Sequence, residues 1–69
     1  MEKLVYKKSA KGKVRQYEHS LWWYEDGELK EILSQDTNKP ELTKWQLSWR
    51  VKQFFRLHPH GTFENAGWV

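Results

Sequence analysis

Residues 42–60, LTKWQLSWRVKQFFRLHPH, have the hydrophobic period of one amphipathic helix, with clear signals at both ends. Thr43 and Gln46 have the spacing of a capping box, in which each side chain accepts a hydrogen bond from the other residue's backbone amide. Pro59 cannot continue a helix, and Gly61 can take the left-handed conformation that often closes one. The sequence therefore predicts a helix over residues 43–57.

The two sides of this predicted helix differ in composition. One side has the spacing of a face that packs on a core, and it carries Leu47, Val51, Phe54, Phe55 and His58. The opposite side carries two aromatic residues and two cations, namely Trp45, Trp49, Lys52 and Arg56. Two interpretations of this second side remain open: the Trp rings cover another apolar layer inside the protein, or they form a binding surface.

The first part of the chain favours strands. Residues 2–8 have a Leu-Val-Tyr centre typical of a short strand, and residues 9–12 have the composition of a turn into a second strand from Lys13. Residues 14–25 are rich in strand-forming side chains and contain no helix start signal. The alternative for residues 1–13 is a flexible basic arm, because their apolar content is small and chain ends fray.

Asp26 and Gly27 give a strong signal for a two-residue hairpin turn, because a type I′ turn needs positive φ at both positions. Such a turn would place Glu25 opposite Glu28 at an exposed acidic tip. The predicted pairing puts Leu21, Trp23 and Ile32 on one side of the ribbon, and Trp22, Tyr24, Leu29 and Leu33 on the other.

A helix over residues 27–35 is the competing interpretation. Leu29, Ile32 and Leu33 also fit helical spacing, and Asp26 would serve as the N-cap. Two helices joined by residues 35–41 would then resemble a helix-turn-helix with an unusually long connection.

The sequence predicts an α+β fold in a single small domain of residues 1–69. A two- or three-stranded antiparallel ribbon, residues 3–33 approximately, is expected to pack on one helix over residues 43–57. A short C-terminal tail follows, in which residues 62–64 favour a strand. Because both sides of the ribbon are apolar, we expect Phe63 and Trp68 to cover the side that the helix leaves open.

The composition limits how so small a chain is stabilised. A core of this size contributes only a few kcal/mol, and the chain has no Cys for a disulfide or a thiolate metal site. Eleven of the 69 residues are Phe, Tyr or Trp, which allows either a compact core or an adhesive surface. We therefore expect a homodimer or a partner that covers an apolar face.

No catalytic site, cofactor or metal site is predicted. The Ser residues have no nucleophile-elbow context, and the chain has no Gly-rich phosphate loop. A zinc site built from His58, His60, His19 and Glu64 would lack the paired ligand spacing of structural zinc sites. We do not expect an enzyme.

The net charge of +3 is distributed in bands. Residues 1–15 contain six Lys or Arg residues and one Glu, residues 16–43 contain seven acids and two Lys, and residues 44–69 contain four cations and one Glu. This pattern suits binding to a polyanion, and it equally suits neutralisation between the bands within the protein.

The leading hypothesis is a small nucleic-acid-binding protein, of the size of accessory or regulatory factors in mobile elements. Cations neutralise phosphates and aromatic rings stack on exposed bases of DNA or RNA. The candidate contacts are Lys7, Lys8, Lys11, Lys13, Arg15, Trp45, Trp49, Lys52 and Arg56. Because no stretch has the apolar length of a signal peptide or a membrane span, we expect a cytoplasmic protein without a membrane partner.

The alternative hypothesis is a protein-binding module or small inhibitor protein. Its contacts would lie on the Trp-rich ribbon and the acidic hairpin tip, at Trp22, Tyr24, Glu25, Asp26, Glu28 and Glu31. Charge separates the two hypotheses, since the first depends on cations and the second on acids.

Overall fold

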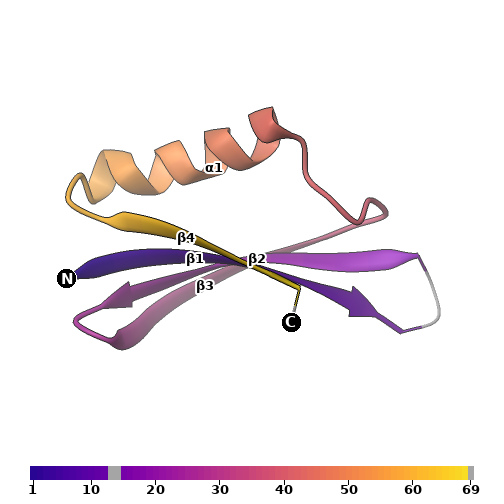
Figure 1. The fold of residues 1–69 in the computed structure, drawn as a ribbon, viewed down its shortest axis with the longest axis horizontal. Helices are drawn as coiled ribbons and strands as arrows, with labels where there is room; N and C mark the ends of the chain where they lie inside the picture. Colours follow the sequence, from indigo (N-terminus) through magenta and orange to yellow (C-terminus); the bar gives the residue numbers. More distant parts are fainter. Residues whose placement is uncertain (13–14, 69) are drawn as a thin grey trace.

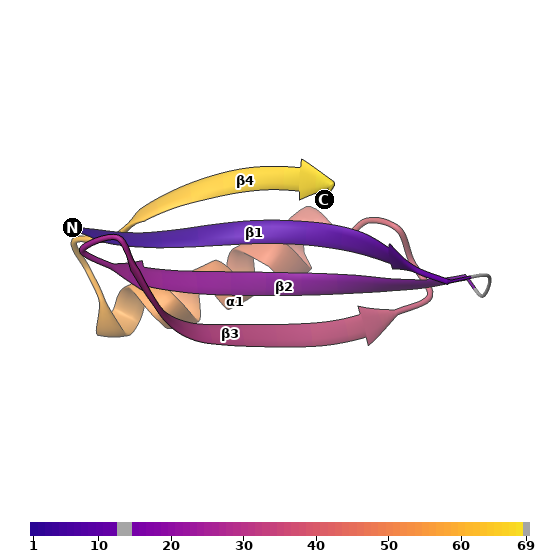
Figure 2. The same ribbon diagram turned by 90° about the horizontal axis from the view of Figure 1, so that it is seen from below.

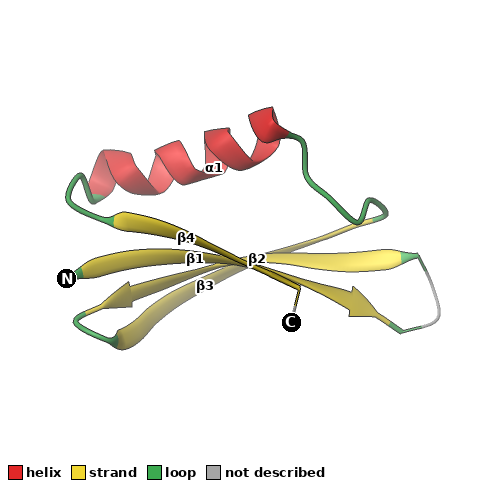
Figure 3. Cartoon of the chain, in the orientation of Figure 1, coloured by secondary structure: helices red, strands yellow, loops and turns green. Residues whose placement is uncertain are grey.

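The computed structural model describes residues 1–12 and 15–68, which form one mixed sheet and one helix (Figures 1 and 3). The elements in chain order are β1 Glu2–Lys11, β2 Gln16–Glu25, β3 Glu28–Thr37, α1 Lys44–Leu57 and β4 Thr62–Trp68. The strand order in the sheet is β3-β2-β1-β4. The α+β expectation is confirmed, with one more strand than predicted and with a strand after the helix.

Strand β1 lies between β2 and β4, in the interior of the sheet. It pairs antiparallel with β2 and parallel with β4. Its Leu4, Val5 and Tyr6 are buried. The strand interpretation of residues 2–8 is therefore confirmed.

The β2–β3 hairpin is present, and the helical alternative for residues 27–35 is wrong. Asp26 has a φ of 52° and Gly27 a φ of 80°, as a type I′ turn requires. Tyr24 pairs with Leu29 and Glu25 with Glu28, as predicted. Asp26 tolerates positive φ better than most non-glycine residues, which explains why this dipeptide turns the chain.

A β-bulge changes the pairing beyond the turn. The register shifts between Trp23 and Tyr24, so that Trp23 pairs with Glu31 and Leu21 with Leu33. Lys30 is the extra residue, and a single extra residue reverses the side on which every later side chain of β3 lies. The predicted assignment of Ile32 to the side of Leu21, and of Leu33 to the opposite side, is therefore wrong.

The predicted helix signals are confirmed at α1. Thr43 accepts a hydrogen bond from the Gln46 amide at 3.1 Å, and the Gln46 side chain accepts one from the Thr43 amide at 3.0 Å. Gly61 does not have the positive φ that was expected of it. It allows a close approach instead, because a Cβ there would lie 2.9 Å from the Phe55 ring and 3.2 Å from the Trp23 ring.

Helix α1 crosses one face of the sheet, and Figure 2 shows it lying behind the strands when the opposite face is viewed. Phe54 is its buried residue and contacts a core of Leu4, Tyr6, Leu21 and Trp23. Leu47 and Val51 are half-buried against this core. The predicted inward side of the helix is thus confirmed.

Strand β4 extends the sheet and does not cover its second face. Phe63 pairs with Leu4 and Trp68 with Lys8, which puts both side chains on the same side as α1. The expectation that Phe63 and Trp68 pack over the open side is wrong, because residues 62–68 form backbone hydrogen bonds at the free edge of β1. In the described part of the chain, no element covers the face that carries Trp22 and Ile32 (Figure 2).

Candidate functional site

The outer face of α1, which we define by Trp45, Trp49, Lys52 and Arg56, points away from the sheet. Trp45 is 85% exposed and Trp49 is 65% exposed. The interpretation in which these rings cover a second internal layer is therefore wrong. The sheet packs on the opposite side of the helix through Phe54, and Figure 1 shows no element above the helix.

The charges of α1 all have one sign. The helix contains Lys44, Arg50, Lys52 and Arg56, and it contains no acid. Within residues 1–12 and 15–68, none of these four cations forms an ion pair. The absence of acids between residues 44 and 57 is visible in the sequence, so Lys44 and Arg50 were candidates that the sequence analysis missed.

The cations of β1 differ from those of α1, because most of them have partners within the protein. Lys8 is buried on the helix side of the sheet and donates to Glu41 at 2.9 Å. Lys11 lies 3.1 Å from Asp36 and 3.2 Å from Glu18. The hydrogen bond to Asp36, and then the one to Glu18, raises the pKa of Lys11. The bands of opposite charge therefore neutralise each other in this part of the sheet.

The other described cations of residues 1–12 and 15 are not on the outer face of α1. Lys7 lies on the open face of the sheet, with its Nζ 3.8 Å from the centre of the Trp22 ring. Arg15 is exposed near the start of β2, and Lys13 lies outside the described residues. Of the nine predicted nucleic-acid contacts, the structure brings together Trp45, Trp49, Lys52 and Arg56.

Hollows flank Trp45 on the helix surface. One of about 600 Å³ lies between α1 and β4 and is lined by Trp45, Leu47, Val51 and Phe63, with Lys44 and Lys52 at its border. Another of about 460 Å³ is lined by Trp45, Trp49, Arg50 and Lys52. Phe63 was not predicted at this site, because its position depends on the pairing of β4 with β1. The site therefore offers apolar depressions bordered by cations.

The residues proposed for protein binding are divided between two faces. Trp22 and Tyr24 are half-buried on the open face of the sheet, whereas Glu25, Glu28 and Glu31 lie toward the helix side. Asp26 is at the turn and accepts a hydrogen bond from the amino group of Met1. This contact raises the pKa of that amino group and lowers the pKa of the Asp26 carboxyl. The Trp-rich ribbon and the acidic tip are thus two separate surfaces.

Comparison with protein-family models, curated proteins and solved structures gives no match to this chain. Among the described residues, α1 is too short and too polar to cross a membrane, and no other helix is present. Any function proposed for the candidate site consequently rests on the chemistry of its own side chains.

Proposed function

We propose that this protein binds single-stranded nucleic acid through the outer face of α1. The observation that supports the proposal is the combination of two exposed Trp rings with four helix cations, none of which has an ionic partner within residues 1–12 and 15–68. A cation without a carboxylate partner is available to replace the counterions of a phosphate backbone.

The spacing of the four residues suits an extended strand. Positions 45, 49, 52 and 56 follow one line along the helix, which at a rise of 1.5 Å per residue is about 16 Å long. Trp45 and Trp49 would stack on bases, and Lys52 and Arg56 would contact phosphates. Stacking on an aromatic side chain needs an unpaired base, and this requirement favours single strands over a duplex.

The charge contribution is tested with the double variant Lys52→Glu, Arg56→Glu. We expect its affinity for a fluorescent single-stranded oligonucleotide at low salt to fall by on the order of tenfold or more, without dependence on base sequence. The slope of log K against log salt should become smaller by about 1.4, because each phosphate contact contributes about 0.7 on single strands. Fluorescence anisotropy across a salt series measures both quantities.

The matched control is Lys3→Glu, Lys30→Glu, which changes the net charge equally on the sheet. Both side chains are about half exposed, with exposures of 46% and 45%, and each has a carboxylate partner. This control should keep most of the affinity. Equal loss in both double variants would show that net charge alone drives binding. Absence of binding to DNA and RNA at low salt would refute the proposal and favour protein binding at the open face of the sheet.

The stacking contribution is tested with Trp49→Ala. Loss of one stacked base costs about 1–3 kcal/mol, so we expect single-strand affinity to fall about 5- to 150-fold, with a smaller change on duplexes. Leu57→Ala is the control, since Leu57 is an apolar residue of the same helix that is 79% exposed. If the two variants bind equally well, Trp49 does not stack on a base.

A further inference from the structure

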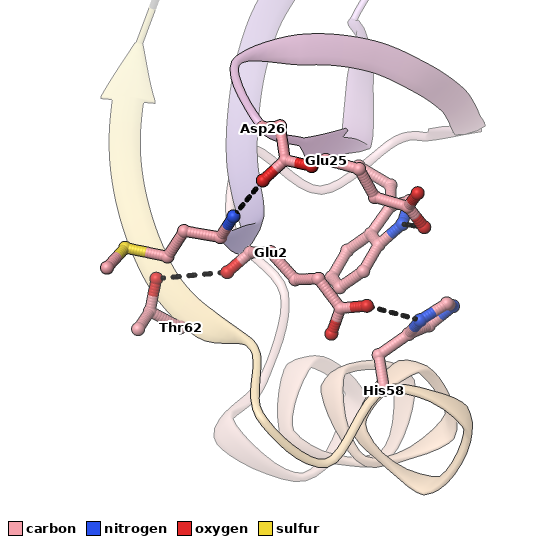
Figure 4. A network of polar contacts seen from close by, with 7 residues as sticks. Glu2, Glu25, Asp26, His58 and Thr62 are labelled. Carbon is pink, nitrogen blue, oxygen red and sulfur yellow. Dashed lines mark hydrogen bonds and ion pairs between the residues drawn. The ribbon is translucent and has the colours of Figure 1, made fainter.

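Three potential metal ligands meet at the end of the sheet where α1 terminates. Glu2 of β1, Glu25 of β2 and His58 each contribute one ligand atom, and these atoms all lie within 4.8 Å of one another. All three side chains are half-buried. Figure 4 shows the Glu2 carboxylate directed at the His58 ring, with Glu25 on the adjacent strand.

The fold holds these side chains in place through distant pairings. The β1–β2 register puts Glu2 directly opposite Glu25, on the side of the sheet that faces α1. His58 caps the C-terminus of α1, where its amide donates to the Phe54 carbonyl at 2.9 Å. Its ring packs against Trp23 with centres 4.2 Å apart, and its Nδ1 lies 3.4 Å from Glu2 Oε1. The imidazole is thus oriented toward the carboxylates by packing.

The electrostatics of this corner favour a cation. Like charges directly opposite on neighbouring strands destabilise a sheet, and the C-terminus of a helix adds partial negative charge. Glu25 accepts one hydrogen bond from the Trp23 indole at 3.3 Å. Within the described residues, His58 is the group of potential positive charge that pairs with Glu2. The charged amino group of Met1 attracts Glu2 and Glu25, but its ion pair is with Asp26. Among the described residues, neither carboxylate forms an ion pair with a Lys, an Arg or this amino group.

We propose that Glu2, Glu25 and His58 bind a divalent cation of the zinc class. Imidazole nitrogen and carboxylate oxygen are ordinary ligands of Zn²⁺, at about 2.0–2.2 Å. Ligand atoms around a tetrahedral ion lie about 3.4 Å apart. Small side-chain rotations that move each ligand atom by about 1 Å would bring the three atoms to this separation. Three protein ligands leave one position for water. Mg²⁺ and Ca²⁺ prefer sites made of oxygen alone, which this corner does not offer.

This inference replaces the zinc arrangement considered from the sequence. His19 is buried, and its two ring nitrogens contact Tyr6 and Lys39, so it is not part of this cluster. His60 is exposed, and Glu64 pairs with Lys3. The ligand set comes instead from residues 2, 25 and 58, which only the folded sheet brings together. The proposal is also independent of nucleic-acid binding, because it concerns other residues.

The experiment is zinc binding by the intact chain, measured by equilibrium dialysis in the cold and by thermal unfolding. We expect one Zn²⁺ per chain and a rise in unfolding temperature of about 5 °C or more at a free zinc concentration tenfold above Kd. Mg²⁺ and Ca²⁺ at the same concentration should give no rise. Glu2→Gln, Glu25→Gln and His58→Gln should each lower the zinc affinity at least tenfold.

His60→Gln is the matched control, since it removes an exposed imidazole two residues from His58 and should leave binding unchanged. Dialysis in the cold reports stoichiometry even for a variant with a low unfolding temperature, and circular dichroism checks that the variant is folded there. Absence of bound zinc in the parent chain would overturn the proposal. Equal loss in His60→Gln and His58→Gln, or no loss in Glu25→Gln, would also overturn it.

Discussion

Replacing Phe54 by Ala is expected to lower the free energy of unfolding by about 3–5 kcal/mol. Phe54 is the buried residue of α1, with 8% of its surface exposed. Its ring stacks on Trp23 with centres 5.8 Å apart, and it contacts the core that Leu4 and Leu21 form beneath it. The truncation would remove apolar burial and leave a cavity between helix and sheet. Small domains have total stabilities of only about 5–15 kcal/mol, so this substitution removes a large part of the stability of the fold.

Urea unfolding followed by circular dichroism measures this loss, and Trp45→Ala is the matched control. Trp45 belongs to the same helix and is a larger aromatic residue, but it is 85% exposed. Its replacement should change the stability by no more than about 0.5 kcal/mol. Similar losses in the two variants would mean that α1 packs on the sheet through a different face.

The helix and its two faces were predictable because the signals are local. The capping box spans Thr43 to Gln46, and the apolar spacing repeats within 14 residues. The same is true of the β2–β3 turn, where the conformational tolerance of Asp26 and Gly27 is a property of two adjacent residues. In each case, local propensity and the final fold agree.

The errors concern interactions between distant residues. The bulge at Lys30 depends on how β2 and β3 pack against other elements, and one inserted residue changed the side of Ile32 and Leu33. Residues 62–64 favour a strand by their composition, but nothing in residues 62–68 indicates which strand they pair with or in which direction. Their pairing with β1 depends on a crossover through α1, which returns the chain to the free edge of β1.

In the candidate site, too, the locally determined features were predictable and those that depend on distant residues were not. The four residues on the outer face of α1 are grouped by helical geometry, and the sequence therefore identified them together. Whether the other cations have acidic partners depends on long-range contacts. Lys8 and Glu41, for example, form a hydrogen bond but lie 33 positions apart in the sequence. The proposed ligands Glu2, Glu25 and His58 lie on β1, on β2 and at the C-cap of α1, so no spacing in the sequence indicates them.

His19 makes the most buried polar contact of the sheet, with 1% of its surface exposed. Its Nε2 lies 2.9 Å from the Lys39 carbonyl, and its Nδ1 lies 2.5 Å from the Tyr6 hydroxyl. A carbonyl can only accept, so Nε2 carries a proton and donates to Lys39, and in the tautomer protonated at Nε2 alone Nδ1 accepts from the Tyr6 hydroxyl. This arrangement links the interior of the sheet to the loop before α1.

Burial raises the pKa of Tyr6, and the charge of Glu41 adds to this effect. The hydroxyl therefore keeps its proton at neutral pH and can donate to His19. Because the pKa of Tyr6 is higher in the folded than in the unfolded chain, its contribution to stability is complete below pH 10 approximately and is lost as the pH rises further.

His19→Leu is expected to lower the free energy of unfolding by about 1–3 kcal/mol, although Leu is apolar and similar in size. The buried Tyr6 hydroxyl would lose its acceptor, and an unsatisfied buried group costs about this much when water cannot replace the partner, whereas the Lys39 carbonyl keeps the Thr37 hydroxyl as a donor at 3.0 Å. Tyr6→Phe removes the other side of the contact. In the double variant the Tyr6 hydroxyl is no longer orphaned, so the two losses should sum to more than the loss measured for both changes together. Urea unfolding of the four proteins measures this coupling, and strictly additive losses would show that the Tyr6–His19 hydrogen bond does not stabilise the fold.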